Sequence, residues 1–438
     1  MPSRPSASTA SGSVGDRLLR QVIAAMIQRR PFNSSLCLCP SFHGWTSDLV
    51  CTILASVPRF FFLSPRSVGR QTFSSRHRSP LRQRNLRLES VPLGPAAHRD
   101  RSLVVLGVSK ALEFYSWIEA IPSSTGFSHN ESTCREMARV LAKSNILPAL
   151  WRFLRSNRHL VTTATVTVII QTLGEQGLAD EALAAFYRMK QLHCKPDVQC
   201  YNTVIAALCR VGMFQTARFL LEQMELPGSR WPPDRFTYTI LISFYCKRSL
   251  QTGCRKAIRR RIWEANRMFR RMLFKGFSPD TVTYNCLIDG LCKTYRIARA
   301  HELFDEMLLK SCSPNRLTYN SFIRYYSAVN EVDKAIEMMR SMEEKNHGSP
   351  TSSSYTPVIH SLCECRRLKE ARDFMAEMVA GGHVPREFTY KLVCDALRDS
   401  GEGGLPEDVR RSVEEGIDER FRRVMRVKPV MRIGKIAN

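Results

Sequence analysis

Apolar residues recur at helical spacing through residues 163–399. In the stretch 281–315, a first stripe with the spacing i, i+3, i+4 and i+7 consists of Tyr284, Leu287, Ile288 and Leu291. A second stripe consists of Ile297, Ala300, Phe304 and Met307. This spacing places apolar side chains on one face of a helix, and Pro314 follows because proline cannot continue a helix. Each helix pair can bury its apolar face only against a neighbouring pair. The pattern therefore predicts an all-α fold of stacked helical hairpins.

The hairpin pattern has a period close to 35 residues. An aromatic marker recurs with spacings of 37, 46, 35, 36 and 35 residues, at Tyr201, Tyr238, Tyr284, Tyr319, Tyr355 and Tyr390. Prolines recur with the same spacings, at Pro196, Pro233, Pro279, Pro314, Pro350 and Pro385. Two series in one register predict internal repeats. We number six repeats in chain order, at 163–197, 198–234, 235–280, 281–315, 316–351 and 352–386, with a partial seventh from residue 387.

The repeats divide the chain into four predicted parts. Residues 1–102 form a leader, and residues 103–162 form an N-terminal helical cap with a degenerate repeat. The repeat array occupies residues 163–399. Residues 400–438 form a capping helix and a tail.

Charge separates two basic regions of the chain. The chain has 438 residues and a formal net charge of +25, which favours polyanionic partners, nucleic acid first. The leader is rich in Arg and Ser, contains no Lys and has few acidic residues, a composition typical of organellar transit peptides. We therefore expect a disordered targeting leader, with residues 16–30 able to form an amphipathic helix. The expected address is the mitochondrion, with the chloroplast as the alternative; a basic tail without an address is the third interpretation.

The third repeat is longer than the others, at 46 residues, and its extra residues are basic. They lie near 248–261 and include Arg255, Lys256, Arg259, Arg260 and Arg261. One interpretation is an extension that binds phosphate. The other is a solvated extension of the second helix, and the sequence leaves both open.

Several kinds of site are not expected. Four cysteines share one position of the first helix and fit core packing, since free Cys behaves as a small apolar residue; they are Cys209, Cys246, Cys292 and Cys363. No apolar run reaches the ~18–20 residues of a membrane helix. No phosphate-binding loop or zinc signature is present, and the 38 residues after Ser400 are too few for a catalytic domain. We expect no catalysis, cofactor, metal or membrane span.

The repeat boundaries carry a family resemblance. Tyr-Asn pairs occur at 201–202, 284–285 and 319–320, and Pro-Asp or Pro-Asn pairs close repeats at 196–197, 233–234, 279–280 and 314–315. This pattern resembles the P-class of the plant pentatricopeptide repeat family over residues 112–399. Tetratricopeptide repeats, with a period of about 34 residues and a Trp/Leu-Gly/Tyr signature, fit it poorly. The resemblance implies a right-handed superhelical solenoid of helix-turn-helix repeats that binds single-stranded RNA, one base per repeat.

The resemblance also implies residue roles. The residue after the marker Tyr and the last residue of each repeat face the base edge, which gives Thr167 with Asp197, Asn202 with Asp234, Thr239 with Asp280, Asn285 with Asn315, Asn320 with Thr351, and Thr356 with Arg386. The second residue of a repeat stacks on bases, chiefly at Phe236, Val282 and Leu317. A basic residue late in the first helix meets phosphate, at Arg210, Lys247 and Lys293. The implied bases are G, U, G, C or U, and a pyrimidine; Arg386 departs from the pattern and leaves the sixth base unassigned.

The expected function is sequence-biased binding of single-stranded RNA in organellar RNA metabolism by a monomer, with organellar RNA-processing or ribosomal proteins as further partners. One alternative is a protein–protein scaffold, because a repeat surface can also hold a peptide. Another is an organellar ribosomal subunit with generic RNA contacts. Salt dependence separates RNA binding from a peptide groove, because phosphate contacts weaken steeply with salt.

Overall fold

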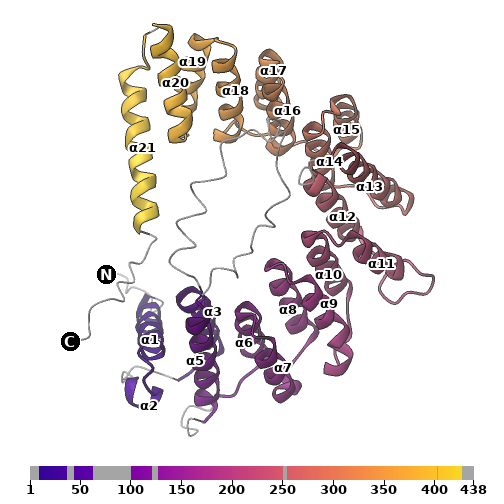
Figure 1. Ribbon diagram of the computed structural model, residues 1–438, viewed down its shortest axis with the longest axis vertical. Coiled ribbons are helices and arrows are strands. Elements are labelled where there is room, and N and C mark those ends of the chain that lie inside the picture. The colour runs from indigo at the N-terminus through magenta and orange to yellow at the C-terminus, as the bar shows by residue number, and fades with distance from the viewer. Residues whose placement is uncertain are drawn as a thin grey trace, which may run out of the picture. The chain divides into compact units, whose positions relative to one another are not determined.

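The predicted all-α fold is confirmed. A computed structural model of the protein describes residues 9–36, 44–62, 100–120, 127–249, 254–401 and 403–426, and every regular element in these ranges is helical. The chain forms two compact units, Met1–Phe244 and Tyr245–Asn438. Figure 1 shows the helices as a succession of pairs. No helix in the described ranges has the length and apolar character needed to cross a membrane.

The first compact unit contains the predicted cap and the first two repeats. Its hairpins are α6 (Glu131–Ser144) with α7 (Leu147–Ser156), α8 (Thr163–Glu175) with α9 (Ala179–Tyr187), and α10 (Val198–Val211) with α11 (Phe214–Met224). The 3₁₀ turns Arg158–Leu160 and Arg188–Leu192 follow α7 and α9. The first helix α8 packs on the first helices α6 and α10. The boundary between the compact units falls inside α12 (Arg235–Ser249).

The second compact unit continues the same pattern. It contains α13 (Arg255–Phe274) and the hairpins α14 (Thr281–Lys293) with α15 (Ile297–Leu309), α16 (Arg316–Ala328) with α17 (Val332–Glu344), α18 (Ser352–Glu364) with α19 (Leu368–Ala380), and α20 (Glu387–Ser400) with α21 (Glu407–Arg426). First helices pack on first helices, with α14 on α16, α16 on α18 and α18 on α20. Residues on α14, α16 and α18 therefore share one layer, to which α15, α17 and α19 do not contribute.

The recurrent tyrosines form the centre of this packing. Tyr238, Tyr284 and Tyr319 are among the largest fully buried side chains. Their hydroxyls still need partners, because a buried polar group without a hydrogen bond is costly. The Tyr284 hydroxyl donates to Glu306 Oε1 over 3.2 Å, and the Tyr355 hydroxyl donates to Glu377 Oε1 over 3.0 Å. In these two repeats the marker tyrosine thus ties the first helix to the end of the second helix.

The leader differs from the expectation of disorder. Residues 9–62 include α1 (Thr9–Ile27), α2 (Phe32–Ser35) and α3 (Ser47–Phe61), and α3 packs on α5 (Arg101–Ala120) and α6. The expected amphipathic segment 16–30 lies largely within α1, whose residues Val22 and Met26 are fully buried. The correction has a simple cause: α1 and α3 carry enough apolar residues to complete the core over α5. The Arg-rich stretch 76–87 lies outside the described residues.

Candidate nucleic-acid interface

The last residue of most repeats begins the next first helix as its N-cap. Asp197 Oδ1 accepts a hydrogen bond from the Cys200 amide over 2.7 Å, and Asp280 Oδ1 accepts one from the Thr283 amide over 2.8 Å. Asn315 caps α16 in the same way. The first backbone N–H groups of a helix have no partner within it, and Asp and Asn satisfy them well. The recurrent Asp and Asn at repeat ends therefore have a structural role that the sequence analysis did not assign.

A buried polar side chain, in six repeats a hydroxyl and in the second a thiol, stands at the third position of the repeat, and in several repeats it contacts the N-cap. Thr237 Oγ1 lies 2.9 Å from Asp234 Oδ1 and donates to Asn202 Oδ1 over 2.7 Å. The third positions of all seven repeats are almost completely buried, at Thr165, Cys200, Thr237, Thr283, Thr318, Ser354 and Thr389. This series was not among the residues predicted from the sequence. Its signal was an Asp, Asn or Thr followed three residues later by Thr or Ser, which resembles a capping box.

Two of the predicted base-edge pairs are in direct contact. Asn202 Nδ2 donates to Asp234 Oδ1 over 3.1 Å, and Asn285 Nδ2 donates to Asn315 Oδ1 over 3.1 Å. In the second pair, Thr318 Oγ1 donates to Asn285 Oδ1 over 2.6 Å, as Thr237 does to Asn202. Each amide is therefore held at both ends between consecutive repeats, and its orientation is fixed by the network.

The Thr-containing positions are arranged differently. The Thr167 hydroxyl donates to the Thr163 carbonyl over 2.9 Å, and the Thr239 hydroxyl donates to the Arg235 carbonyl over 3.1 Å. Both threonines are buried, with 7% and 8% exposure. Such bonds to the preceding helical turn are common for Thr. The Thr hydroxyls thus bond to their own helix, whereas the Asn amides bond to the neighbouring N-cap.

The later pairs depart from this geometry. Asn320 is buried, and its Oδ1 accepts from Ser354 Oγ over 2.7 Å, while the Thr351 amide donates to the same Ser354 hydroxyl over 3.3 Å. Thr356 is half-buried, and Arg386 begins α20 without a side-chain cap. Ser354 thus links Asn320 to the start of the next repeat in place of a direct Asn320–Thr351 contact.

The predicted stacking residues are exposed apolar side chains at the second position of the repeat. The exposed fractions are 55% for Phe236, 56% for Val282 and 61% for Leu317. Phe388, at the same position of the seventh repeat, is 46% exposed. Because each lies one residue before the buried hydroxyl of the cap network, apolar surface and polar edge groups alternate at the start of each first helix.

The predicted phosphate contacts are exposed, and Lys293 is paired with a carboxylate. Arg210, Lys247 and Lys293 lie at the ends of α10, α12 and α14. Lys293 forms an ion pair with Asp289, which also accepts a hydrogen bond from Arg324 over 2.9 Å. Phosphate at Lys293 would have to compete with this carboxylate.

The recurrent cysteines pack in the core as predicted. Cys209, Cys246 and Cys292 are buried, and Cys363 is half-buried. Burial raises the pKa of the Cys292 thiol to about 12 and that of Cys363 to about 11. Thiols with such a pKa remain protonated and are poor ligands. Among the described residues, no group of three His, Cys, Asp or Glu could hold a metal ion.

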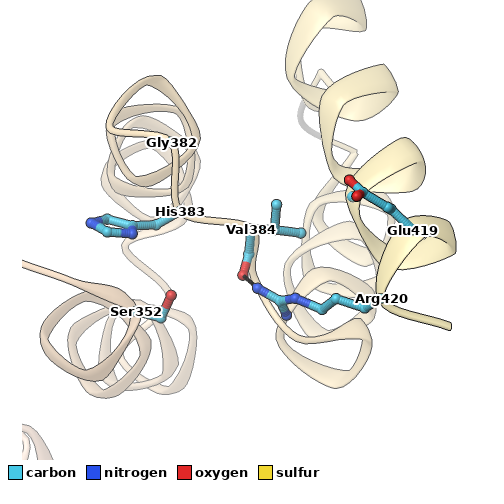
Figure 2. Close-up of a pocket in the computed structure, with 7 residues that line it drawn as sticks. Ser352, Gly382, His383, Val384, Glu419 and Arg420 are labelled. Atoms are coloured by element: carbon cyan, nitrogen blue, oxygen red, sulfur yellow. Dashed lines mark hydrogen bonds between the residues drawn. The ribbon is translucent and has the colours of Figure 1, made fainter. Parts of the chain in front are cut away.

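A small pocket lies away from these positions, between the start of α18, the loop after α19 and α21. Its wall includes Ser352, His383, Val384, Glu419 and Arg420, and its volume is about 320 Å³. Figure 2 shows the Arg420 guanidinium directed at the backbone beside Val384, where it donates to the carbonyls of Val384 and Pro385. These bonds attach α21 to the loop after α19, which gives the pocket residues a structural role.

Models of the pentatricopeptide repeat match much of this chain. The PPR repeat family model matches residues 196–247, 257–293 and 279–324, and the PPR repeat model matches residues 317–347 and 353–383. The pentatricopeptide repeat domain model matches residues 162–210. All matched segments lie within residues 162–383.

Curated relatives and solved structures carry the same repeat. A pentatricopeptide repeat-containing protein of Arabidopsis thaliana is 58% identical over 430 residues, which cover 95% of this chain and 93% of that protein. Another from Arabidopsis thaliana, named as mitochondrial, is 32% identical over 137 residues, 30% of this chain and 29% of that protein. The crystal structure of pentatricopeptide repeat protein PPR10 in complex with an 18-nt psaJ RNA element aligns with a TM-score of 0.36 and 20% identity, over 75% of this chain and 60% of that chain. The 58% identity over nearly the whole length decides the matter: this chain belongs to the pentatricopeptide repeat family.

Proposed function

We propose that the protein binds single-stranded RNA with sequence bias and acts in organellar RNA metabolism without catalysis of its own. The observation that carries this proposal is the bridge Asn202–Asp234–Thr237 and its repetition as Asn285–Asn315–Thr318. Each bridge presents oriented polar groups next to an exposed apolar residue. Polar groups that read a base edge, combined with a surface on which the base stacks, are what single-strand recognition requires.

The bridges leave complementary groups available for bases. The hydrogen bonds of the Asp234 carboxylate all go to Oδ1, so Oδ2 can accept from the ring N–H of uracil or guanine. At Asn315 the bonds from α16 and Asn285 go to Oδ1, so the amide nitrogen can donate to a base acceptor such as cytosine N3. A carboxylate only accepts, whereas an amide does both. This chemistry supports the expected bases, U at the second repeat and C or U at the fourth.

Stacking would supply much of the affinity. Phe236 and Leu317 are exposed at the starts of α12 and α16, and the Arg235 guanidinium lies 5.2 Å from the centre of the Phe236 ring. Base stacking on such side chains contributes about 1–3 kcal/mol per base. Ala164, Gln199 and Ser353 occupy the same position in other repeats and offer less apolar surface. We therefore assign the strongest binding to the central repeats.

The N-caps support a second candidate function, a protein–protein scaffold. Because Asp197, Asp280 and Asn315 satisfy helix N–H groups, capping alone could account for their recurrence. Capping does not account for the exposed apolar residues at the second position of the repeats. We therefore favour RNA binding over the scaffold. An organellar ribosomal subunit that contacts RNA without base preference is the third candidate.

The deciding experiment measures the affinity of the whole chain for short RNAs that contain G-U-G-C or G-U-G-U, against scrambled RNAs of equal length. Asn202→Thr should shift the preferred second base from U towards G, and Thr239→Asn should shift the third from G towards U. Binding without preference would favour the ribosomal interpretation. An absence of RNA binding at moderate salt would favour the scaffold.

The proposed function also includes a subcellular location. The Arg-rich, acid-poor residues 1–102 favour import into an organelle, and we propose the mitochondrion, with the chloroplast as the alternative. The expected effects on a transcript are end protection, processing, splicing or translation, with organellar RNA-processing or ribosomal proteins as partners. Fractionation of cells that express the tagged full-length chain would test the address.

A further inference from the structure

The helix α13 differs in charge from the equivalent helices of its compact unit. It carries eight basic residues and one acidic residue. The corresponding second helix α15 has one Arg and three acidic residues, α17 has two basic and four acidic residues, and α19 has two basic and three acidic residues. All four helices occupy the same place in their repeats, so the charge of α13 does not follow from its place in the fold.

The basic residues of α13 lie opposite its packed face. Ile262, Met268 and Met272 are buried, and Phe269 places its ring 5.8 Å from the Tyr284 ring of α14. The opposite side, which we call the α13 basic face, consists of the exposed residues Lys256, Arg259, Arg260, Trp263 and Arg270. Trp263 is 52% exposed on this face. Four cationic side chains and one aromatic ring therefore share one solvent-facing surface.

This charge does not stabilise the helix. Arg255 and Lys256 stand in the first turn, where the helix dipole favours acidic residues and α13 has none. Lys256 and Arg260 are four residues apart, a spacing at which like charges repel on a helix surface. The acidic residue, Glu264, is buried and lies 3.5 Å from Arg267. The clustered positive charge thus disfavours the helix, and a negatively charged partner would neutralise it.

We propose that the α13 basic face binds the phosphodiester backbone of RNA that flanks the segment read by the first helices, without base preference. Phosphates pair with clustered Lys and Arg, and Trp263 offers a ring on which an unpaired base can stack. An anionic membrane fits less well, because a helix that lies on a membrane inserts its apolar face and that of α13 is buried against α14. The inference rests on the proposed function, since it concerns the same RNA.

The test compares two variants with equal loss of charge. The basic-face variant carries Lys256→Gln, Arg259→Gln, Arg260→Gln and Arg270→Gln. The matched control carries Arg299→Gln, Lys334→Gln, Lys369→Gln and Arg372→Gln on α15, α17 and α19. Affinity is measured across a salt series for two RNAs: a short one that holds only the predicted bases, and the same bases with unrelated flanks on both sides. Circular dichroism checks the helix content of both variants.

On the flanked RNA, the basic-face variant should bind at least ~10-fold more weakly at low salt and lower the salt slope by about 2–3, because each lost phosphate contact removes ~0.7 from the slope for single strands. The control should lower the slope by less than about 1. On the short RNA, both variants should match the unchanged chain and keep its base preference. If the basic-face variant does not fold, Lys256→Gln with Arg259→Gln should show half of the slope change.

Equal losses of affinity in the two variants on the flanked RNA would overturn the proposal. It would also be overturned if the basic-face variant lost as much affinity for the short RNA as for the flanked RNA. Vesicles of phosphatidylserine and phosphatidylcholine provide a further arm: vesicle binding that the basic-face variant abolishes, with RNA binding unchanged, would assign the face to a membrane. Failure of the proposed function looks different. The unchanged chain would then lack base preference, while the two variants would still differ on the flanked RNA. An absence of binding to both RNAs overturns both proposals.

Discussion

At the scale of single residues, one side chain often serves two neighbouring repeats. Thr318 Oγ1 accepts from the backbone N–H of Asn315 over 3.1 Å and donates to the side-chain oxygen Oδ1 of Asn285 over 2.6 Å. It therefore supports the N-cap of α16 and also orients a predicted base-edge amide on α14. If the protein reads RNA bases as proposed, the fully buried Thr318 can thereby influence base selection.

Thr318→Val keeps the side-chain shape and removes the hydroxyl. We expect the free energy of unfolding to fall by about 1–3 kcal/mol, because Asn285 Oδ1 and the backbone N–H of Asn315 lose a partner. We also expect the discrimination at the fourth base to weaken, since the Asn285 amide is no longer held in one orientation. Urea denaturation and binding to RNAs that vary only at the fourth base measure the two effects.

The matched control is Thr203→Val on α10. The Thr203 hydroxyl donates to the Gln199 carbonyl of its own helix over 2.7 Å and links no two repeats. This variant should change stability by less than about 1 kcal/mol and leave base preference intact. Equal effects of the two substitutions would contradict the proposed role of Thr318.

At the scale of helices, small residues at two places allow the first helices of neighbouring repeats to pack closely. A Cβ placed on Gly174 of α8 would lie 2.5 Å from Ala207 Cβ on α10, and one placed on Gly290 of α14 would lie 2.9 Å from Cys246 Cβ on α12. The twelfth residue of one repeat thus meets the tenth residue of the next. One of the two must be Gly for the helices to approach this closely.

Gly174→Ala should therefore destabilise the first compact unit by about 1–3 kcal/mol, the usual cost of overpacking, although Ala favours a helix more than Gly does. Adding Ala207→Gly should recover part of this loss, because the extra methyl group returns to the space that Ala207 vacates. Thermal unfolding of the two single variants and the double variant measures the coupling. Additive losses would show that the two positions do not compete for space.

At the scale of the whole molecule, part of the leader belongs to the folded chain. Ile53 and Leu54 of α3 are fully buried, and the Asn130 amide at the N-cap of α6 donates to Ser47 Oγ over 2.8 Å. Trp45 places its ring 5.8 Å from the rings of Phe114 and Trp117 on α5. If residues 1–102 carry a targeting signal, these contacts require that its removal spare α3.

Ile53→Ala should lower the free energy of unfolding by about 2–5 kcal/mol, as expected for a large-to-small change in a core. Because α3 packs on α6, the backbone amides of α6 should also exchange faster with deuterium. The control Thr52→Ala changes an exposed neighbour and should leave α6 protected. Unchanged protection of α6 in Ile53→Ala would show that α3 folds as an independent appendage.

The sequence by itself determined the repeats, their helical hairpins and the family, because apolar spacing, prolines and the marker tyrosines are local and recur in register. It also indicated which second positions, such as Phe236 and Leu317, carry exposed apolar side chains. It did not reveal that Thr318 and its equivalents link one repeat to the next, because a hydroxyl has no partner until two helices are packed. The leader shows the same limit: composition alone predicted disorder, whereas the burial of Ile53 depends on the surfaces of α5 and α6. Only the tertiary structure decides such contacts, since they join residues that are distant in the chain.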